Sequence, residues 1–111
     1  MYKAILIDSV NKEVREVEVT GGLKNIYKLL DCTLIEAGTY LGSDCIYVDE
    51  EGVIAGKENG FTIDDQLFVG SGLLVGTDEQ GNSVSPLLSK EALNKKVKFF
   101  DITEEMEVNY V

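Results

Sequence analysis

The chain begins with an apolar run that is followed by alternating apolar and acidic positions. Residues Tyr2–Asp8 are almost continuously apolar and end at turn-forming residues, which is typical of a buried strand. After a loop at 9–12, Val17 and Val19 alternate with acidic side chains, as in a half-exposed strand. We therefore predict that the chain opens with a β-hairpin.

Two later segments have the spacing of short helices. In 21–30 the apolar positions recur at i, i+3, i+4 and i+7, which gives a helix one apolar stripe. Ser89 stands before 90–97 as an N-cap, and Leu93 and Val97 give that second helix an apolar side. The stripe of the first helix consists of Leu23, Ile26, Tyr27 and Leu30.

The stretch between the helices predicts short strands separated by turns. The acidic turns 49–52 and 77–81 end in glycine and are typical of connections between adjacent antiparallel strands. The predicted fold class is α+β: an antiparallel sheet of five or more short strands with two helices, one after the first hairpin and one near the C-terminus. Besides the opening hairpin, the expected strands are 33–35, 45–48, 53–55, 66–69 and 73–75.

The length predicts a single domain over residues 1–111, because a second core in so short a chain would be too small to be stable. Residues 101–111 mix acidic and apolar positions, so we expect an edge strand or a tail there. Pairing of this segment with its copy across an exposed edge would give a homodimer.

The composition restricts the chemistry of the protein. Its 111 residues include 20 acidic and 10 basic side chains and no histidine, for a net charge of −10. Without histidine, the commonest general base and the commonest neutral metal ligand are missing. The negative charge opposes direct binding to nucleic acid or to an anionic membrane. No apolar run approaches the roughly 20 residues that span a bilayer, so we expect no membrane segment.

Acidic residues concentrate in the central part of the chain, and five of them form the predicted acidic surface. Such a group can act as an acid–base pair or hold a hard cation, yet the regular spacing of a calcium loop is missing. We therefore interpret these residues as solvated turns and expect no metal. The five are Asp49, Glu50, Glu51, Asp64 and Asp65.

Five other residues are candidates for contact with a ligand or a partner. The glycines of the run 70–76 either line a ligand site or mark a bulge, since the run lacks the Lys-Ser/Thr ending of a phosphate-binding loop. A tyrosine in a glycine-flanked loop is free to stack on a ligand. Two lysines that end the second helix either receive an anion or complement the helix dipole. These candidates are Tyr40, Gly70, Gly72, Lys95 and Lys96.

The two cysteines support neither a disulfide framework nor a four-ligand zinc site. We interpret Cys32 and Cys45 as buried free thiols. With so few catalytic residue types in the chain, we assign no catalytic residue and expect no cofactor.

Several segments, taken in order, resemble a known family. Gly22-Leu23 opens a short helix, 48–52 (Val-Asp-Glu-Glu-Gly) forms a central turn, and 69–76 forms a glycine-rich strand before an acidic turn. Over roughly Tyr2 to Leu93 the chain resembles a family of small phage and plasmid proteins, the domain-of-unknown-function family 3846. The resemblance implies a phage, prophage or plasmid origin. It implies no activity. Because the chain has only two cysteines and opens without the pattern of a signal peptide, we expect it in the cytoplasm of the bacterial host.

These features together favour non-catalytic binding. We expect a protein of a phage or other mobile element that sequesters a host-defence component, which is either a small nucleotide-like signal or a protein. One alternative is an acidic mimic of DNA that blocks a DNA-binding protein, since carboxylates can stand in for phosphates. Another is a small enzyme that uses carboxylate chemistry, which requires two carboxylates in unequal environments within a cleft.

Overall fold

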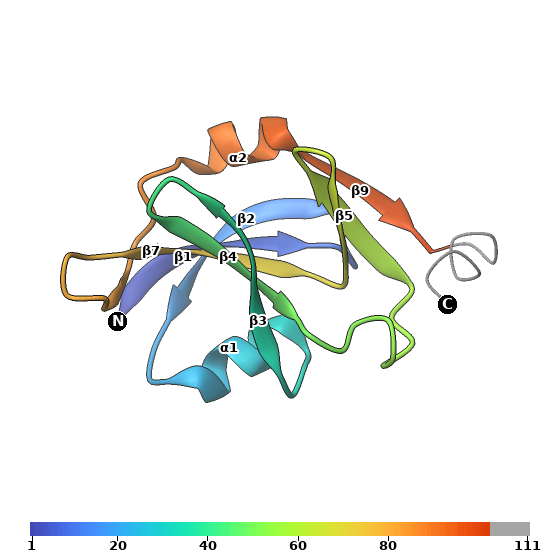
Figure 1. Ribbon diagram of the computed structural model, residues 1–111, viewed down its shortest axis with the longest axis horizontal. Helices are drawn as coiled ribbons and strands as arrows, with labels where there is room; N and C mark the ends of the chain where they lie inside the picture. The colour runs from blue at the N-terminus through green and yellow to red at the C-terminus, as the bar shows by residue number, and fades with distance from the viewer. Residues whose placement is uncertain (103–111) are drawn as a thin grey trace.

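The computed structural model describes residues 1–102, which form two antiparallel β-sheets and two short helices (Figure 1). In chain order the elements are β1 (Tyr2–Asp8), β2 (Glu13–Val19), α1 (Leu23–Leu30), β3 (Ile35–Leu41), β4 (Asp44–Asp49), β5 (Asn59–Ile63), β6 (Gln66–Val69), β7 (Gly72–Thr77), β8 (Ser83–Val84), α2 (Lys90–Lys96) and β9 (Val97–Asp101).

The larger sheet has β7 at its centre, although β7 lies late in the chain. The strand order is β2-β1-β7-β4-β3, and β8 pairs with the end of β7. Leu74 of β7 lies opposite Ile5 of β1 on one side and opposite Ile46 of β4 on the other. All three side chains are buried, as the middle of a covered sheet requires. The smaller sheet has the order β6-β5-β9.

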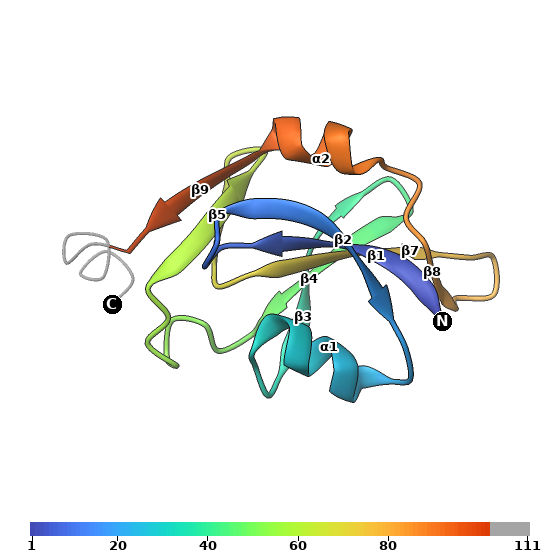
Figure 2. The ribbon, with the colours of Figure 1, turned by 180° about the vertical axis from the view of Figure 1, so that it is seen from behind.

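Both faces of the larger sheet are covered, so the molecule has two cores. One core lies between the two sheets and α2, and contains the fully buried Phe61 of β5 and Leu93 of α2. The other lies against α1, which contributes Ile26 and Leu30. Figures 1 and 2 show α1 and α2 on opposite sides of the larger sheet. Successive residues of β1 join the two cores alternately, which explains why this strand is apolar throughout.

The structure confirms the α+β class, the opening hairpin and both helices. Ser89 caps α2 as expected, because its Oγ accepts a hydrogen bond from the Ala92 N–H at 3.1 Å. Asp31 takes a left-handed conformation (φ 51°) and ends α1. Leu23, which was expected in the apolar stripe of α1, is exposed, so the buried part of that stripe is confined to the later turns.

The central strands differ from the prediction in two places. The strand expected at 33–35 begins at Ile35 and continues to Leu41, because this whole stretch pairs with β4 apart from a bulge at Gly38. The strand expected at 53–55 is wrong, because those residues form turns.

Residues 50–58, which we call the crossing segment, carry the chain from the larger sheet to the smaller one. The prediction that 49–52 is a turn between adjacent strands is therefore wrong, since β4 and β5 belong to different sheets. The turn expected at 77–81 does join adjacent antiparallel strands, β7 and β8.

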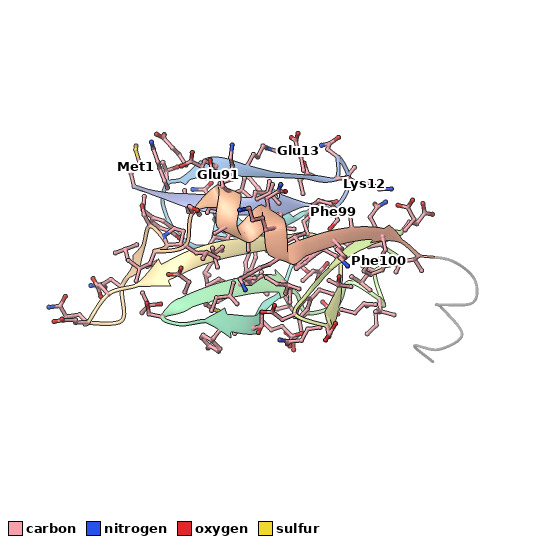
Figure 3. All side chains as sticks on the ribbon, turned by 90° about the horizontal axis from the view of Figure 1, so that it is seen from above. Met1, Lys12, Glu13, Glu91, Phe99 and Phe100 are labelled. Carbon is pink, nitrogen blue, oxygen red and sulfur yellow. The ribbon has the colours of Figure 1, made fainter. Side chains whose placement is uncertain are left out.

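Strands β5, β8 and β9 were not predicted. Gly60 interrupts the sequence pattern of β5, and a Cβ at this position would collide with the Phe68 carbonyl and the Phe100 ring. Figure 3 shows Phe99 and Phe100 along β9, on the side of the molecule where Lys12 ends the β1–β2 hairpin. The Lys12 ammonium lies 2.9 Å from the Asp101 carboxylate and joins the two sheets at the surface.

The predicted edge strand or tail at 101–111 falls mostly on residues 103–111, which lie outside the described residues, as does the homodimer contact expected of it. In residues 1–102, no helix is long and apolar enough to cross a membrane.

Candidate functional site

Two hollows of about 250 Å³ each flank the crossing segment. The first, which we call the edge groove, opens between β3, β6 and the crossing segment. The second, which we call the hairpin pocket, lies between the β1–β2 loop, the end of α1 and the β6–β7 turn. The edge groove is lined by Glu36, Val48, Asp49, Glu50, Gly52, Val53, Ile54, Leu67, Phe68 and Val69.

The edge groove exists because both sheets end on the same side of the molecule. β3 is the last strand of the larger sheet and β6 is the last strand of the smaller one. At the bulge, Gly38 lies against the Phe68 ring, which leaves no space for a Cβ. Beyond the bulge, the Gln66 amide donates a hydrogen bond of 2.9 Å to the Thr39 hydroxyl and joins the two edges. The groove therefore lies between two edge strands, each of which is paired within its own sheet.

The crossing segment forms the third wall and is held by a buried ion pair. The Lys57 ammonium lies 2.9 Å from Asp49 Oδ2 and donates a hydrogen bond of 2.8 Å to the Leu30 carbonyl at the end of α1. Asp49 Oδ1 accepts a hydrogen bond from the Glu51 N–H at 2.8 Å. The Asp49 side chain is 3% exposed and that of Lys57 is 19% exposed, so water screens this pair weakly. These contacts fix both ends of the segment that carries Ile54.

Exposed apolar side chains gather at this groove. Val53 and Ile54 project from the crossing segment with 46% and 84% of their surface exposed, and Leu67 of β6 is 40% exposed. Leu34 borders them, because its carbonyl accepts a hydrogen bond from the Glu50 N–H. In residues 1–102 these four are almost half of the nine exposed large hydrophobic side chains. Such a concentration is typical of an interaction site, whereas single exposed apolar residues are not.

The charges around the edge groove all have one sign. Its charged lining residues are Glu36, Asp49 and Glu50. Asp49 is neutralised by Lys57, so two free carboxylates remain at the rim. Glu51 lines an adjoining hollow that shares Ile54 with the groove. The groove thus offers an apolar surface with an acidic rim, which complements a partner that is both apolar and basic.

The hairpin pocket is more polar, and its charges are bound to one another. The buried Asp8 carboxylate accepts hydrogen bonds from the Val10 and Asn11 N–H groups at 3.1 Å and pairs with the Arg15 guanidinium. The fully buried Ser9 donates its hydroxyl proton to the Gly70 carbonyl at 2.7 Å. These bonds tie the hairpin loop to the turn before β7.

Electrostatics in the hairpin pocket do not favour an anionic ligand. Burial raises the pKa of Asp8, but hydrogen bonds from Arg15 and Asn11 lower it by more, so the pKa lies below the ordinary value of an aspartic acid and the charged form is favoured. Arg15 and Lys57 are therefore both paired with carboxylates, and Asp31 and Glu58 add further negative charge to the lining. A phosphate group would meet more negative than positive charge here.

The structure separates the predicted ligand residues. Tyr40 lies on strand β3 and not in a loop; its side chain is 66% exposed on the α1 side of the sheet, outside both hollows. Gly70 lines the hairpin pocket with φ 95°, and the Lys57 side chain passes over it. Gly72 is buried against the rings and methyl groups of Phe61 and Ile46, so it serves the core.

The remaining predicted site residues also lie apart. Lys95 and Lys96 are exposed at the end of α2, and the Lys96 ammonium is 3.9 Å from the Asp64 carboxylate. Asp64 and Asp65 form the tight turn between β5 and β6, where both have positive φ.

Of the other three acids in the predicted acidic surface, Glu50 is exposed, Glu51 is half-buried and Asp49 is buried. The prediction of a solvated Asp49 is wrong, because the carboxylate is held inside by Lys57.

Both cysteines are free, and Cys45 is buried while Cys32 is half-buried. Burial raises the pKa of each thiol, and the Asp49 charge raises that of Cys32 further. Over residues 1–102, no three acidic or cysteine side chains lie together as a metal site would require.

A sequence model of the family described as Domain of unknown function (DUF3846) matches residues 2–99. The chain belongs to the DUF3846 family. In this DUF3846 protein the matched region begins with β1 and reaches into β9, so it includes both sheets and both helices. No curated protein and no solved structure matched the chain. The family description states no activity.

Sequence reasoning missed most residues of the edge groove in this DUF3846 protein. Only Asp49 and Glu50 of its lining were among the predicted site residues. The signal that could have revealed the groove is the apolar pair Val53-Ile54, which stands between two glycines. This segment is as apolar as a strand but too short to form one.

Proposed function

We propose that this protein is a non-catalytic binding protein of a phage or other mobile element, and that it sequesters a host protein in the edge groove. The observation that carries the proposal is the cluster of exposed apolar side chains inside an acidic rim. Ile54 and Leu67 would contact an apolar element of the partner, while Glu36 and Glu50 would pair with its basic side chains.

A protein partner fits the structure better than a nucleotide-like signal does. The edge groove is open and its exposed residues are apolar, which suits a partner surface. The hairpin pocket is the alternative place for a small ligand, yet its two cations are already bound to Asp8 and Asp49. A phosphorylated signal would have to displace those carboxylates at considerable cost.

The test is affinity capture from phage-infected bacteria with the native chain and two matched variants. Ile54→Asp places a charge in the edge groove. Leu87→Asp is the matched control, because it places the same charge at another exposed aliphatic residue. Leu87 is 86% exposed and Ile54 is 84% exposed. Neither residue is part of a core, so both variants should fold. We expect one host protein to be retained by the native chain and by Leu87→Asp, and to be lost with Ile54→Asp.

Salt separates this proposal from mimicry of DNA. Apolar contacts in the edge groove should hold the partner when salt is raised, whereas a mimic bound through rows of carboxylates should release it steeply. Three carboxylates that such a mimic could use, those of Asp8, Asp44 and Asp49, are buried and accept internal hydrogen bonds. Capture that is equal for both variants and is abolished by moderate salt would favour the mimic.

A further inference from the structure

The two edges of the larger sheet differ in the way they are protected. β2 forms one edge, and its seven residues include Glu13, Arg15, Glu16 and Glu18. β3 forms the other, and Glu36 is its only charged residue. Charged side chains on an edge strand hinder the addition of another strand. The edge at β2 is therefore protected, while the edge at β3 is open to pairing.

The outer backbone groups of β3 have no partner in the described part of the chain. β3 pairs with β4 on one side, and no strand lies on its other side. The backbone hydrogen bonds outside the sheets reach the neighbouring Leu34 carbonyl but none of the residues Ile35–Leu41. Alternate residues of an antiparallel edge strand direct both N–H and C=O outward, and these groups can receive a new strand.

The bulge limits where a strand can be added. It divides β3 at Gly38, whose position is fixed by the Phe68 ring. The run 35–37 lies on the groove side of the bulge, because Glu36 lines the groove. A strand paired with 35–37 would extend the larger sheet across the open side of the groove, and its side chains would meet Ile54 and Leu67.

We propose that the partner of the edge groove binds as an extended segment that adds a strand to β3 and carries both apolar and basic residues. This inference rests on the proposed function and specifies how the partner is held. The segment's backbone pairs with residues 35–37, and its basic side chains face Glu36 and Glu50. A second copy of this chain fits less well, because it would bring another net charge of −10 to an acidic rim.

The test uses a seven-residue peptide of alternating lysine and valine, labelled with a fluorophore, and the same peptide with all backbone amides N-methylated. Anisotropy gives both affinities, and hydrogen exchange locates the protected amides of the full chain. We expect the unmodified peptide to bind about ten times more tightly, since two or three backbone hydrogen bonds are lost on methylation. When the peptide binds, hydrogen exchange in Ile35–Leu41 should slow. Exchange in Glu13–Val19, the edge strand that carries the charged side chains, should not change.

Three results would overturn the inference. One is binding through side chains alone, seen as equal affinity of the two peptides or as no protection of β3 by the peptide. If Ile54→Asp still prevents host-protein capture in that case, the proposed function stands. Another is failure of the unmodified peptide to bind at all. A third is slow hydrogen exchange of the β3 amides in the absence of peptide, together with a protein mass in solution that is twice that of one chain. The occupant of the β3 edge would then be a second copy of this chain. If peptide binding follows the prediction but no host protein is captured, the proposed function fails instead.

Discussion

Replacement of Lys57 by methionine tests whether the buried ion pair holds the crossing segment. Methionine keeps most of the side-chain volume but removes the ammonium, which leaves the Asp49 carboxylate, only 3% exposed, without its counter-charge. The Leu30 carbonyl loses its donor as well. Breaking a buried ion pair from one side costs about 3–5 kcal/mol, and the 19% exposure of Lys57 places this case near about 3 kcal/mol.

Urea unfolding followed by circular dichroism measures this loss. At a slope of about 1.5 kcal/mol per molar, a loss of about 3 kcal/mol lowers the urea midpoint by about 2 M. The melting temperature should fall by about 12 °C. Asp49→Asn is the matched partner variant, because its amide oxygen can still accept the Glu51 N–H. In a double-mutant cycle the pair should show a coupling of about 1–2 kcal/mol.

Two results would refute this reasoning. If Lys57→Met lowers the free energy of unfolding by less than about 1 kcal/mol at an unchanged slope, the pair does not hold the segment. If the losses of unfolding free energy from Lys57→Met and Asp49→Asn simply add, the two groups act independently. The contact of 2.9 Å then contributes no coupling free energy.

Three further predictions concern other parts of the molecule. The folded-state pKa of Asp8 is lowered from the ordinary value of an aspartic acid, so its stabilisation is fully present above that ordinary pKa and is lost as the pH falls through the lowered one. Asp8→Asn should therefore lower the free energy of unfolding by about 2 kcal/mol near neutral pH, and the difference from the native chain should shrink in acid. Gly60→Ala should cost about 3 kcal/mol in urea unfolding, because the new Cβ meets the rigid Phe68 carbonyl, whereas Gly22→Ala, with open space around it, should cost less than about 1 kcal/mol. Burial raises the pKa of both cysteine thiols, so mass spectrometry should show slow alkylation by iodoacetamide in the native protein and fast alkylation in urea.

The elements that the sequence predicts well are those with a local cause. The opening hairpin follows from the apolar run of β1 and the alternation in β2, and α2 follows from the Ser89 cap. The order of strands has no such local signal. β7 is inserted between β1 and β4 by contacts between residues far apart in the chain, as in the pairing of Ile5 with Leu74. The α+β class was therefore predictable, and the two-sheet arrangement was not.

The misread segments have identifiable physical reasons. β5 contains Gly60, which weakens a strand pattern, but the glycine is needed because Phe100 packs against the backbone there. Residues 53–55 have the apolar composition of a strand, yet Ile54 is exposed on the crossing segment. Places where local sequence rules fail are often functional, and this failure coincides with the edge groove. Glu36 and Leu67 could not be assigned to the site, because only tertiary structure brings β3 and β6 together.

Native mass spectrometry of the protein recovered from phage-infected bacteria tests the central claim most directly. The account predicts that the native chain and Leu87→Asp each carry the added mass of one host protein, and that Ile54→Asp is recovered without it. A host protein that stays bound to Ile54→Asp, or an added mass of only a small molecule on all three chains, would contradict the claim that the edge groove is the binding site.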